Sequence, residues 1–170
     1  MFMRNINAIN DLEFLRFMPH KSRADCLDWM AHSHSQIKQD LFVLSELEFK
    51  KDGFFVEFGA TDGVGLSNSF LLEKEFNWSG ILAEPGREWQ EALNQNRAAA
   101  IDTRCVWIDS DKRLLFNQTD DKELSTIDSF SGLDSHADKR HSGLRYEVQT
   151  VSLLDLLKSH QAPYEIDYLS

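Results

Sequence analysis

A short apolar segment that runs directly into a glycine turn constrains the fold of this chain more than any other feature. The segment spans Phe54–Phe58, and the turn that follows carries Gly59 and Gly63. Aromatic and β-branched residues favour a strand, and a helical pattern resumes near Ser67. A strand, a glycine turn and a helix in this order are typical of α/β folds, which present backbone N–H groups to a nucleotide-like ligand. The sequence therefore predicts an α/β domain with a ligand site at this turn.

Two glutamates mark the strands around this turn. Glu57 lies inside the apolar segment, where a carboxylate without a partner would be costly to bury. We therefore expect it to meet a ligand or a satisfied hydrogen-bond network. Glu84 ends a second short apolar strand over residues 78–83, and it follows Gly63 at about the 20-residue spacing at which a second-strand acid accepts ribose hydroxyls. The alternative is an ordinary strand and glycine turn that bind no ligand.

The bulk properties restrict the class of protein. A chain of 170 residues with 42% apolar residues suits a single globular domain with its own core. The net charge is −10 and no cluster of lysine or arginine stands out, so we expect no nucleic-acid partner. No segment approaches the ~18 apolar residues of a membrane span, and the first residues lack the apolar core of a signal peptide. Cys26 and Cys105 form neither a disulfide framework nor a CxxC pair, so a soluble cytoplasmic protein is expected.

The chain divides into an N-terminal helical segment over residues 1–50 and an α/β domain over residues 51–170. Three helices are predicted in the first part, over residues 10–18, 22–31 and 35–47. The third has one apolar face at helical spacing, formed by Ile37, Leu41, Leu44 and Leu47.

The α/β domain alternates strands and helices. After the first strand, a helix begins with a cap at Ser67 and ends before Asn77, and the second strand is followed by a helix over residues 89–96. A third strand is predicted over residues 103–108. This order implies a parallel sheet with helices on its faces.

The last third of the chain is less regular. The pattern predicts strand-like pieces at 114–116 and 124–127, a long polar loop over 128–143, a strand over 146–151 and a helix from Ser152 to near His160. A fourth core strand opens at Ile166–Leu169, where the sequence stops. A core strand is rarely the end of an α/β sheet. We therefore expect a domain truncated after the start of this strand, with an exposed sheet edge through which the chain could self-associate.

A set of short motifs is distributed over residues 35–170. It comprises Ser35–Gln36, Gln39–Val43, Phe54–Gly63, Leu66–Asn68, Leu71–Glu73, Trp78–Gly80, Ala83–Pro85, Asn96–Arg97, Leu124–Ile127, Val148–Thr150, Ser152–Leu157 and Ile166–Ser170. Jointly they resemble the FkbM-type methyltransferases. That family binds S-adenosylmethionine and transfers its methyl group, usually to a hydroxyl oxygen. The resemblance implies a Rossmann-like methyltransferase sheet and, as acceptor, a small molecule or a sugar hydroxyl.

The resemblance also implies a cofactor site. The residues that would hold the methionine end of S-adenosylmethionine are Glu57, Gly59, Ala60, Thr61, Asp62 and Gly63. Glu84, followed by Pro85, would take the ribose hydroxyls, and Cys105 and Val106 would flank the adenine. The residues that would close over the cofactor are Gln36, Gln39 and Asp40. The family usually continues beyond Ser170 into further strands, so this chain would carry mainly the cofactor-binding half.

Some roles receive no residue. No catalytic base is assigned, because His136 and His141 lie in the polar loop, where solvation is their expected state. No metal site is expected, since the pair His32 and His34 has no third ligand at a compatible spacing.

Two other functions remain open. One is a non-catalytic domain that keeps the fold to bind a partner. The other is a nicotinamide-dinucleotide binder, which shares the glycine turn and the ribose acid. Against the second, Asp62 places an acid where a pyrophosphate would lie, and like charges repel. An acid there better suits the ammonium group of a methionine moiety.

Overall fold

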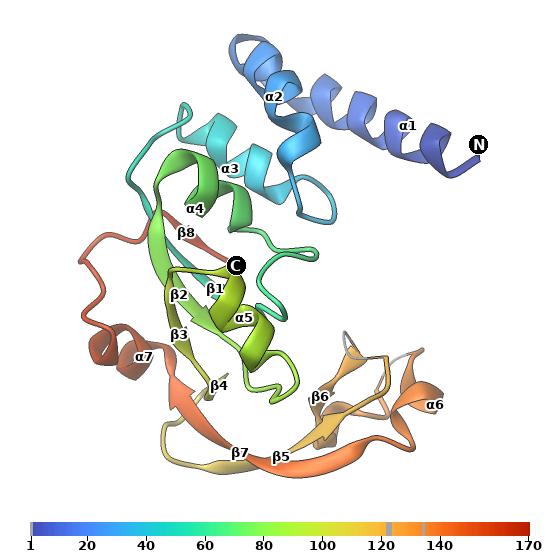
Figure 1. Cartoon of the computed structure of the whole chain (residues 1–170), viewed down its shortest axis with the longest axis vertical. Helices are drawn as coiled ribbons and strands as arrows, with labels where there is room; N and C mark the ends of the chain where they lie inside the picture. The colour runs from blue at the N-terminus through green and yellow to red at the C-terminus, as the bar shows by residue number, and fades with distance from the viewer. Residues whose placement is uncertain (1, 122–123, 134) are drawn as a thin grey trace.

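A four-stranded parallel sheet forms the centre of the fold (Figure 1). The computed structural model of the chain describes residues 2–121, 124–133 and 135–170. The strand order is β3-β2-β1-β8, with β1 at Phe54–Phe58, β2 at Ser79–Ala83, β3 at Ala100–Asp102 and β8 at Tyr168–Leu169. Neighbouring strands pair in parallel throughout. The predicted α/β class with a parallel sheet is therefore confirmed.

The third strand of this sheet is not the predicted one. The pattern placed it at residues 103–108, but the strand that pairs with β2 is β3. The chain turns directly after it, where the backbone N–H and the Nε of Arg104 both donate to Asp102 Oδ1 at 2.9 Å. The more apolar segment beyond the turn, β4 at Cys105–Trp107, pairs with another sheet. The prediction was wrong because apolar character indicates a strand but not its partner.

Helices cover one face of the parallel sheet. They are α3 at Gln39–Glu46, α4 at Phe70–Phe76 and α5 at Gln90–Asn96. Their buried leucines, among them Leu44, Leu72 and Leu93, share one apolar cluster with Phe55 of β1 and Leu82 of β2. Each leucine side chain removed from water in this way contributes about 1.5–3 kcal/mol to stability.

The opposite face of the sheet is covered by α7 at Leu153–Ser159. Leu156 of this helix packs against Val56 and Ile81, whose side chains alternate with those facing the first cluster. The predicted cap of the helix is confirmed, because Ser152 Oγ accepts from the backbone N–H of Asp155 at 3.2 Å. Helices on both faces explain why β1 and β2 read as nearly continuous apolar runs.

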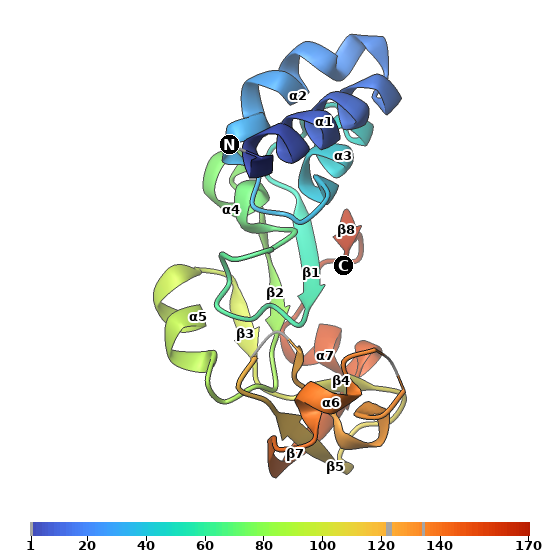
Figure 2. The same cartoon turned by 90° about the vertical axis from the view of Figure 1, so that its right-hand side faces the viewer.

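A second, mixed sheet has the order β4-β7-β5-β6. Its remaining strands are β5 at Arg113–Gln118, β6 at Thr126–Ile127 and β7 at Leu144–Ser152. β7 pairs antiparallel with β5 and parallel with β4. In Figure 2, β1 and β2 point with their carboxyl ends toward this sheet.

The segment predicted as a long polar loop, residues 128–143, has more regular structure than expected in its described part, 128–133 and 135–143. It contains a 3-10 turn at Asp128–Phe130 and a short helix, α6, at Ala137–Arg140. Buried Asn117 of β5 holds this segment, since its Nδ2 donates to Ser131 Oγ at 2.8 Å and to the carbonyl oxygen of Arg140 at 2.9 Å. A polar sequence is thus ordered by a contact from a distant strand.

The N-terminal helices lie at the end of the molecule opposite to the second sheet (Figure 2). They are α1 at Phe2–Phe17, a 3-10 turn at His20–Ser22, α2 at Arg23–Trp29 and a second 3-10 turn at Met30–His32. α1 thus begins earlier than predicted. α3 begins later, because Lys38 takes a left-handed backbone with φ +66° and Ile37 is 72% exposed instead of lying on the apolar face. None of the helices in the described part of the chain combines the length and apolar character needed to cross a bilayer.

Gly80 marks the tightest contact between β1 and β2. A Cβ at this position would lie 2.5 Å from both the carbonyl oxygen and the ring of Phe55. We expect Gly80→Ala to lower the free energy of unfolding by about 2 kcal/mol, because neither the strand backbone nor the packed ring can move aside freely. Urea unfolding measures this loss. Gly132→Ala is the matched control, since a Cβ there meets nothing within 4 Å. Equal unfolding midpoints for the two variants would contradict the expectation.

Candidate functional site

The loop between β1 and α4 has an unusual backbone. Gly59, Thr61 and Gly63 all have positive φ, at +66°, +49° and +79°. Of the three, Thr61 has the highest conformational free energy, because a β-branched residue rarely takes a positive φ outside functional or strained sites. The loop is held internally, with the N–H of Gly63 donating to the carbonyl oxygen of Ala60 at 2.8 Å. Asp62 accepts two further N–H groups at 2.8 Å, from Val64 and Gly65.

A cavity of about 460 Å³ lies at the carboxyl ends of β1 and β2. We call it the strand-end cavity. On the parallel-sheet side its walls are Phe58, Gly59, Ala83 and Pro85, and on the second-sheet side they are Cys105, Val106, Trp107, Phe116, Thr126 and Ile127. Ligands of open α/β sheets bind in the crevice outside the carboxyl ends of the strands. The structure thus brings four of the predicted site residues to one cavity: Gly59, Pro85, Cys105 and Val106.

Gly59 opens the main chain to this cavity. A Cβ built on Gly59 would meet no atom within 4 Å. The backbone N–H of Gly59 donates to the carbonyl oxygen of Ala83 at 2.8 Å, which fixes the start of the loop against β2. A ligand can therefore approach the backbone closely at a point that is itself held in place.

Glu57 is buried at the centre of a hydrogen-bond network, one of the two expected outcomes for this residue. Its Oε1 accepts from the backbone N–H of Asn68 at 2.9 Å. Its Oε2 accepts from the hydroxyls of Ser67, at 3.0 Å, and of Ser69. The carboxylate thus fixes the segment that leads into α4.

Glu84 joins two loops at the rim of the strand-end cavity. It stands between the lining residues Ala83 and Pro85 and is only 4% exposed. Its Oε1 accepts from the N–H of Gly86 at 2.6 Å and its Oε2 from the N–H of Thr61 at 2.9 Å. Burial raises the pKa of Glu84, although these two N–H groups favour the charged form. A carboxylate has about four acceptor positions, and the two N–H groups occupy two of them.

Cys105 contributes a thiol to the cavity wall. It is 8% exposed, and burial, with the nearby Glu84 carboxylate, raises its pKa to about 11. A thiol with so high a pKa stays protonated at neutral pH and acts as a small apolar group. Cys105 therefore suits contact with a ring rather than nucleophilic chemistry.

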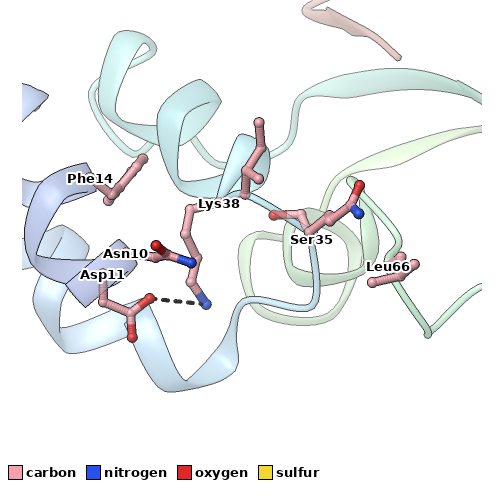
Figure 3. A pocket seen from close by; sticks show the side chains of 8 residues that line it. Asn10, Asp11, Phe14, Ser35, Lys38 and Leu66 are labelled. Carbon is pink, nitrogen blue, oxygen red and sulfur yellow. Dashed lines mark ion pairs between the residues drawn. The ribbon is translucent and has the colours of Figure 1, made fainter. Parts of the chain in front are cut away.

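The three predicted residues around α3 lie away from the strand-end cavity. Gln36 lines a separate cavity, also of about 460 Å³, together with Asp11, Phe14, Lys38 and Leu66 (Figure 3). Lys38 Nζ and Asp11 Oδ1 form an ion pair there at 3.8 Å.

Gln39 and Asp40 instead hold the start of α3. Gln39 Oε1 accepts from the N–H of Ile37 at 2.9 Å. Asp40 is fully buried, and its Oδ1 accepts from the hydroxyls of Ser33 at 2.7 Å and Ser35 at 2.6 Å. Ser35 in turn forms a β-bridge with Leu66, so this segment touches the far end of the loop that begins at Gly59.

The two histidines of the His-x-His pair pack against aromatic rings. His32 packs edge-on against Trp29, and His34 packs against Phe70. Within residues 2–121, 124–133 and 135–170, no group of three or more His, Cys, Asp or Glu side chains is placed to hold a metal ion.

Several residues of the site were not predicted from the sequence. The wall residues Trp107, Phe116, Thr126 and Ile127 come from three strands of the second sheet. Their apolar alternation indicates strands, but no spacing indicates that these strands would face Gly59. Arg97 is the other missed residue, and a lone arginine after a helix gives no local signal of its contacts.

The site as a whole combines three chemical features. The strand-end cavity is mainly apolar, the buried Glu84 carboxylate stands between two of its lining residues in the chain, and the open backbone of Gly59 lines the cavity. This arrangement suits a ligand with a flat apolar ring that carries hydroxyl groups. Comparison of the sequence with protein-family models, with curated proteins and with solved structures finds no match.

Proposed function

We propose that the chain binds S-adenosylmethionine in the strand-end cavity as an FkbM-type methyltransferase with a Rossmann-like sheet. Its acceptor is the hydroxyl oxygen of a small molecule or a sugar. The observation that carries this proposal is the open backbone of Gly59 at the carboxyl ends of β1 and β2, next to the rim carboxylate of Glu84. The fold supports it, since ligands of parallel α/β sheets occupy this position.

Each part of the cofactor finds residues of fitting chemistry. Glu84 would take the ribose hydroxyls, with two of its about four acceptor positions occupied by N–H groups. Val106 and Phe116 offer an apolar wall to the adenine ring. The loop from Gly59 to Gly63, with the Asp62 carboxylate, would hold the methionine end, whose ammonium group favours an acid.

The contribution of the protein to the reaction is to orient the cofactor and the acceptor relative to one another. S-adenosylmethionine supplies an already activated methyl group when bound. The chain holds the cofactor and keeps water out of an apolar cavity, and alignment of two reactants can lower a barrier by roughly 7–11 kcal/mol.

The hydrogen bonds of the loop favour this cofactor over a dinucleotide. A pyrophosphate needs free N–H groups in the turn and at the start of the following helix. Here the N–H groups of Val64 and Gly65 already donate to Asp62.

The start of α4 is occupied in the same way. The N–H of Asn68 donates to Glu57 at 2.9 Å, and that of Phe70 donates to Ser67 Oγ at 3.2 Å. A pyrophosphate would therefore meet carboxylates where it needs donors, and carboxylates repel it.

Titration calorimetry with S-adenosylhomocysteine tests the function. We expect the wild-type chain to bind it and Glu84→Ala to bind it about tenfold more weakly, because ribose hydroxyls lose a charged acceptor. The control is Glu75→Ala, which removes an exposed glutamate of α4. Competition with NAD forms the second arm, and S-adenosylhomocysteine is expected to bind more tightly.

Each contrary result has its own meaning. Equal affinity of wild type and Glu84→Ala would remove Glu84 from the site. Tighter binding of NAD would replace the proposal with the nicotinamide-dinucleotide binder. Binding of S-adenosylhomocysteine without transfer of a labelled methyl group to any compound of a cell extract would favour the non-catalytic binding domain.

A further inference from the structure

We propose that Arg97 is the positioning residue of the loop between β1 and α4, and that ligand affinity at the strand-end cavity depends on it. The arginine acts through the loop on the ligand of the proposed function, S-adenosylmethionine, and its role rests on that function. Its side chain is fully buried and is not among the residues that line the cavity.

Arg97 contacts the loop at three points. It directly follows α5, and its Nη1 donates to the carbonyl oxygen of Gly63 at 2.9 Å and to Ser67 Oγ at 3.1 Å. Its Nη2 donates to Ser69 Oγ at 2.9 Å. Its Nε donates to Glu73 Oε2 at 2.9 Å, which anchors the guanidinium on α4. Four donor contacts in one plane use the fork geometry that arginine alone among cationic side chains provides.

The two serine hydroxyls connect Arg97 to Glu57. A guanidinium donates and never accepts, and a hydroxyl carries a single proton. Since Ser67 and Ser69 both accept from Arg97, each directs its proton to Glu57 Oε2. The arginine therefore fixes the orientation of the two hydroxyls that donate to Glu57 Oε2, while Oε1 accepts separately from the N–H of Asn68.

Gly63 and Arg97 also fit each other sterically. A Cβ at Gly63 would lie 2.5 Å from Arg97 Cγ, and the φ of +79° disfavours any side chain at this position. The space that a residue other than glycine would need is filled by the arginine stem. The Arg97 side chain can therefore occupy this position only because residue 63 is a glycine.

The loop is thus held from two sides. Glu84 holds it at Thr61, next to the cavity, and Arg97 holds it at Gly63, Ser67 and Ser69. A loop held in its binding conformation spends less free energy on ordering when a ligand binds. Loss of the guanidinium fork would release the far half of the loop, from Gly63 to Ser69, which directly follows Asp62.

The test is Arg97→Lys in the full chain, which keeps the charge but not the fork. Two quantities are measured: amide hydrogen exchange over residues 59–69 without ligand, and the Kd of S-adenosylhomocysteine. We expect exchange in the loop to become about tenfold faster and binding about tenfold weaker, since buried acceptors lose their donors. The control is Leu156→Ala, which weakens the core on the opposite face of the sheet.

Normal loop exchange and a normal Kd in Arg97→Lys would overturn the proposal. So would an equal loss of affinity in Leu156→Ala, because general destabilisation would then explain both. If Arg97→Lys does not fold, Ser69→Ala removes one bridge to Glu57, and wild-type behaviour of that variant overturns the proposal instead. If the wild type does not bind S-adenosylhomocysteine, the proposed function fails, whereas the exchange measurement still decides whether Arg97 positions the loop.

Discussion

Replacement of Gly59 by valine is expected to weaken the binding of S-adenosylhomocysteine by roughly a hundredfold or more, since a side chain there occupies the space of the ligand. A Cβ at Gly59 meets no protein atom within 4 Å, and Gly59 is one of the residues that line the strand-end cavity. The cost to the fold is smaller, about 1–3 kcal/mol, because it arises only from a side chain at positive φ. Calorimetry measures the affinity and urea unfolding measures the stability.

The strain needs its own control, and Asn77 provides it. Asn77 ends α4 with a left-handed backbone, φ +57°, and is exposed to solvent. Asn77→Val places the same side chain in the same conformation far from the cavity, so it should lose comparable stability and retain full affinity. Wild-type affinity in Gly59→Val would show that the ligand binds elsewhere. A similar loss of affinity in Asn77→Val would attribute the effect to strain.

Alkylation of Cys105 by iodoacetamide at pH 8 is expected to be roughly a hundredfold slower than that of an exposed thiol. The pKa of Cys105 is raised from 9.0 to about 11 by burial and by the nearby Glu84 carboxylate, so the reactive thiolate is correspondingly scarce. The rate should keep rising with pH up to about 11. Saturating S-adenosylhomocysteine should slow it further, because Cys105 lines the strand-end cavity. Mass spectrometry of the alkylated peptides gives the rate at each cysteine.

The reference thiol for this experiment comes from Ser142→Cys, at an exposed position after α6. Both thiols then react in one sample under identical conditions. A Cys105 rate that levels off near pH 9, or that equals the reference rate, would contradict the buried environment. If alkylation is slow but S-adenosylhomocysteine does not change its rate, the buried environment of Cys105 stands. The ligand would then bind away from Cys105.

Local signals predicted the centre of the fold well. The strand at Phe54–Phe58, the left-handed glycines after it and the cap at Ser152 depend on residues only a few positions apart. β propensity, the tolerance of glycine for positive φ and the bond from a serine to the N–H three residues on all act within such a window. The need of Glu57 for partners was also predicted from the sequence, since a carboxylate within an apolar run is costly to bury without them.

Other features depend on which distant segments meet. Cys105–Trp107 is the more apolar strand, yet Ala100–Asp102 pairs with β2, because the bonds from Arg104 to Asp102 turn the chain between them. The family resemblance implied that Gln36 and Asp40 would close over the cofactor. In the structure Gln36 lines a second cavity, and Asp40 holds the start of α3.

The sequence by itself determined the strand–turn–helix unit and the parallel α/β class, since both follow from short-range propensity and periodicity. It also determined that Glu57 needs partners, because a buried carboxylate without them is costly. Only the tertiary structure decided that Phe116 and Ile127 form the wall opposite Gly59, and that Arg97 lies beneath Gly63. These contacts join segments far apart in the chain. Their formation depends on how two sheets pack and on how buried donors and acceptors are satisfied, which no pattern within a single window encodes.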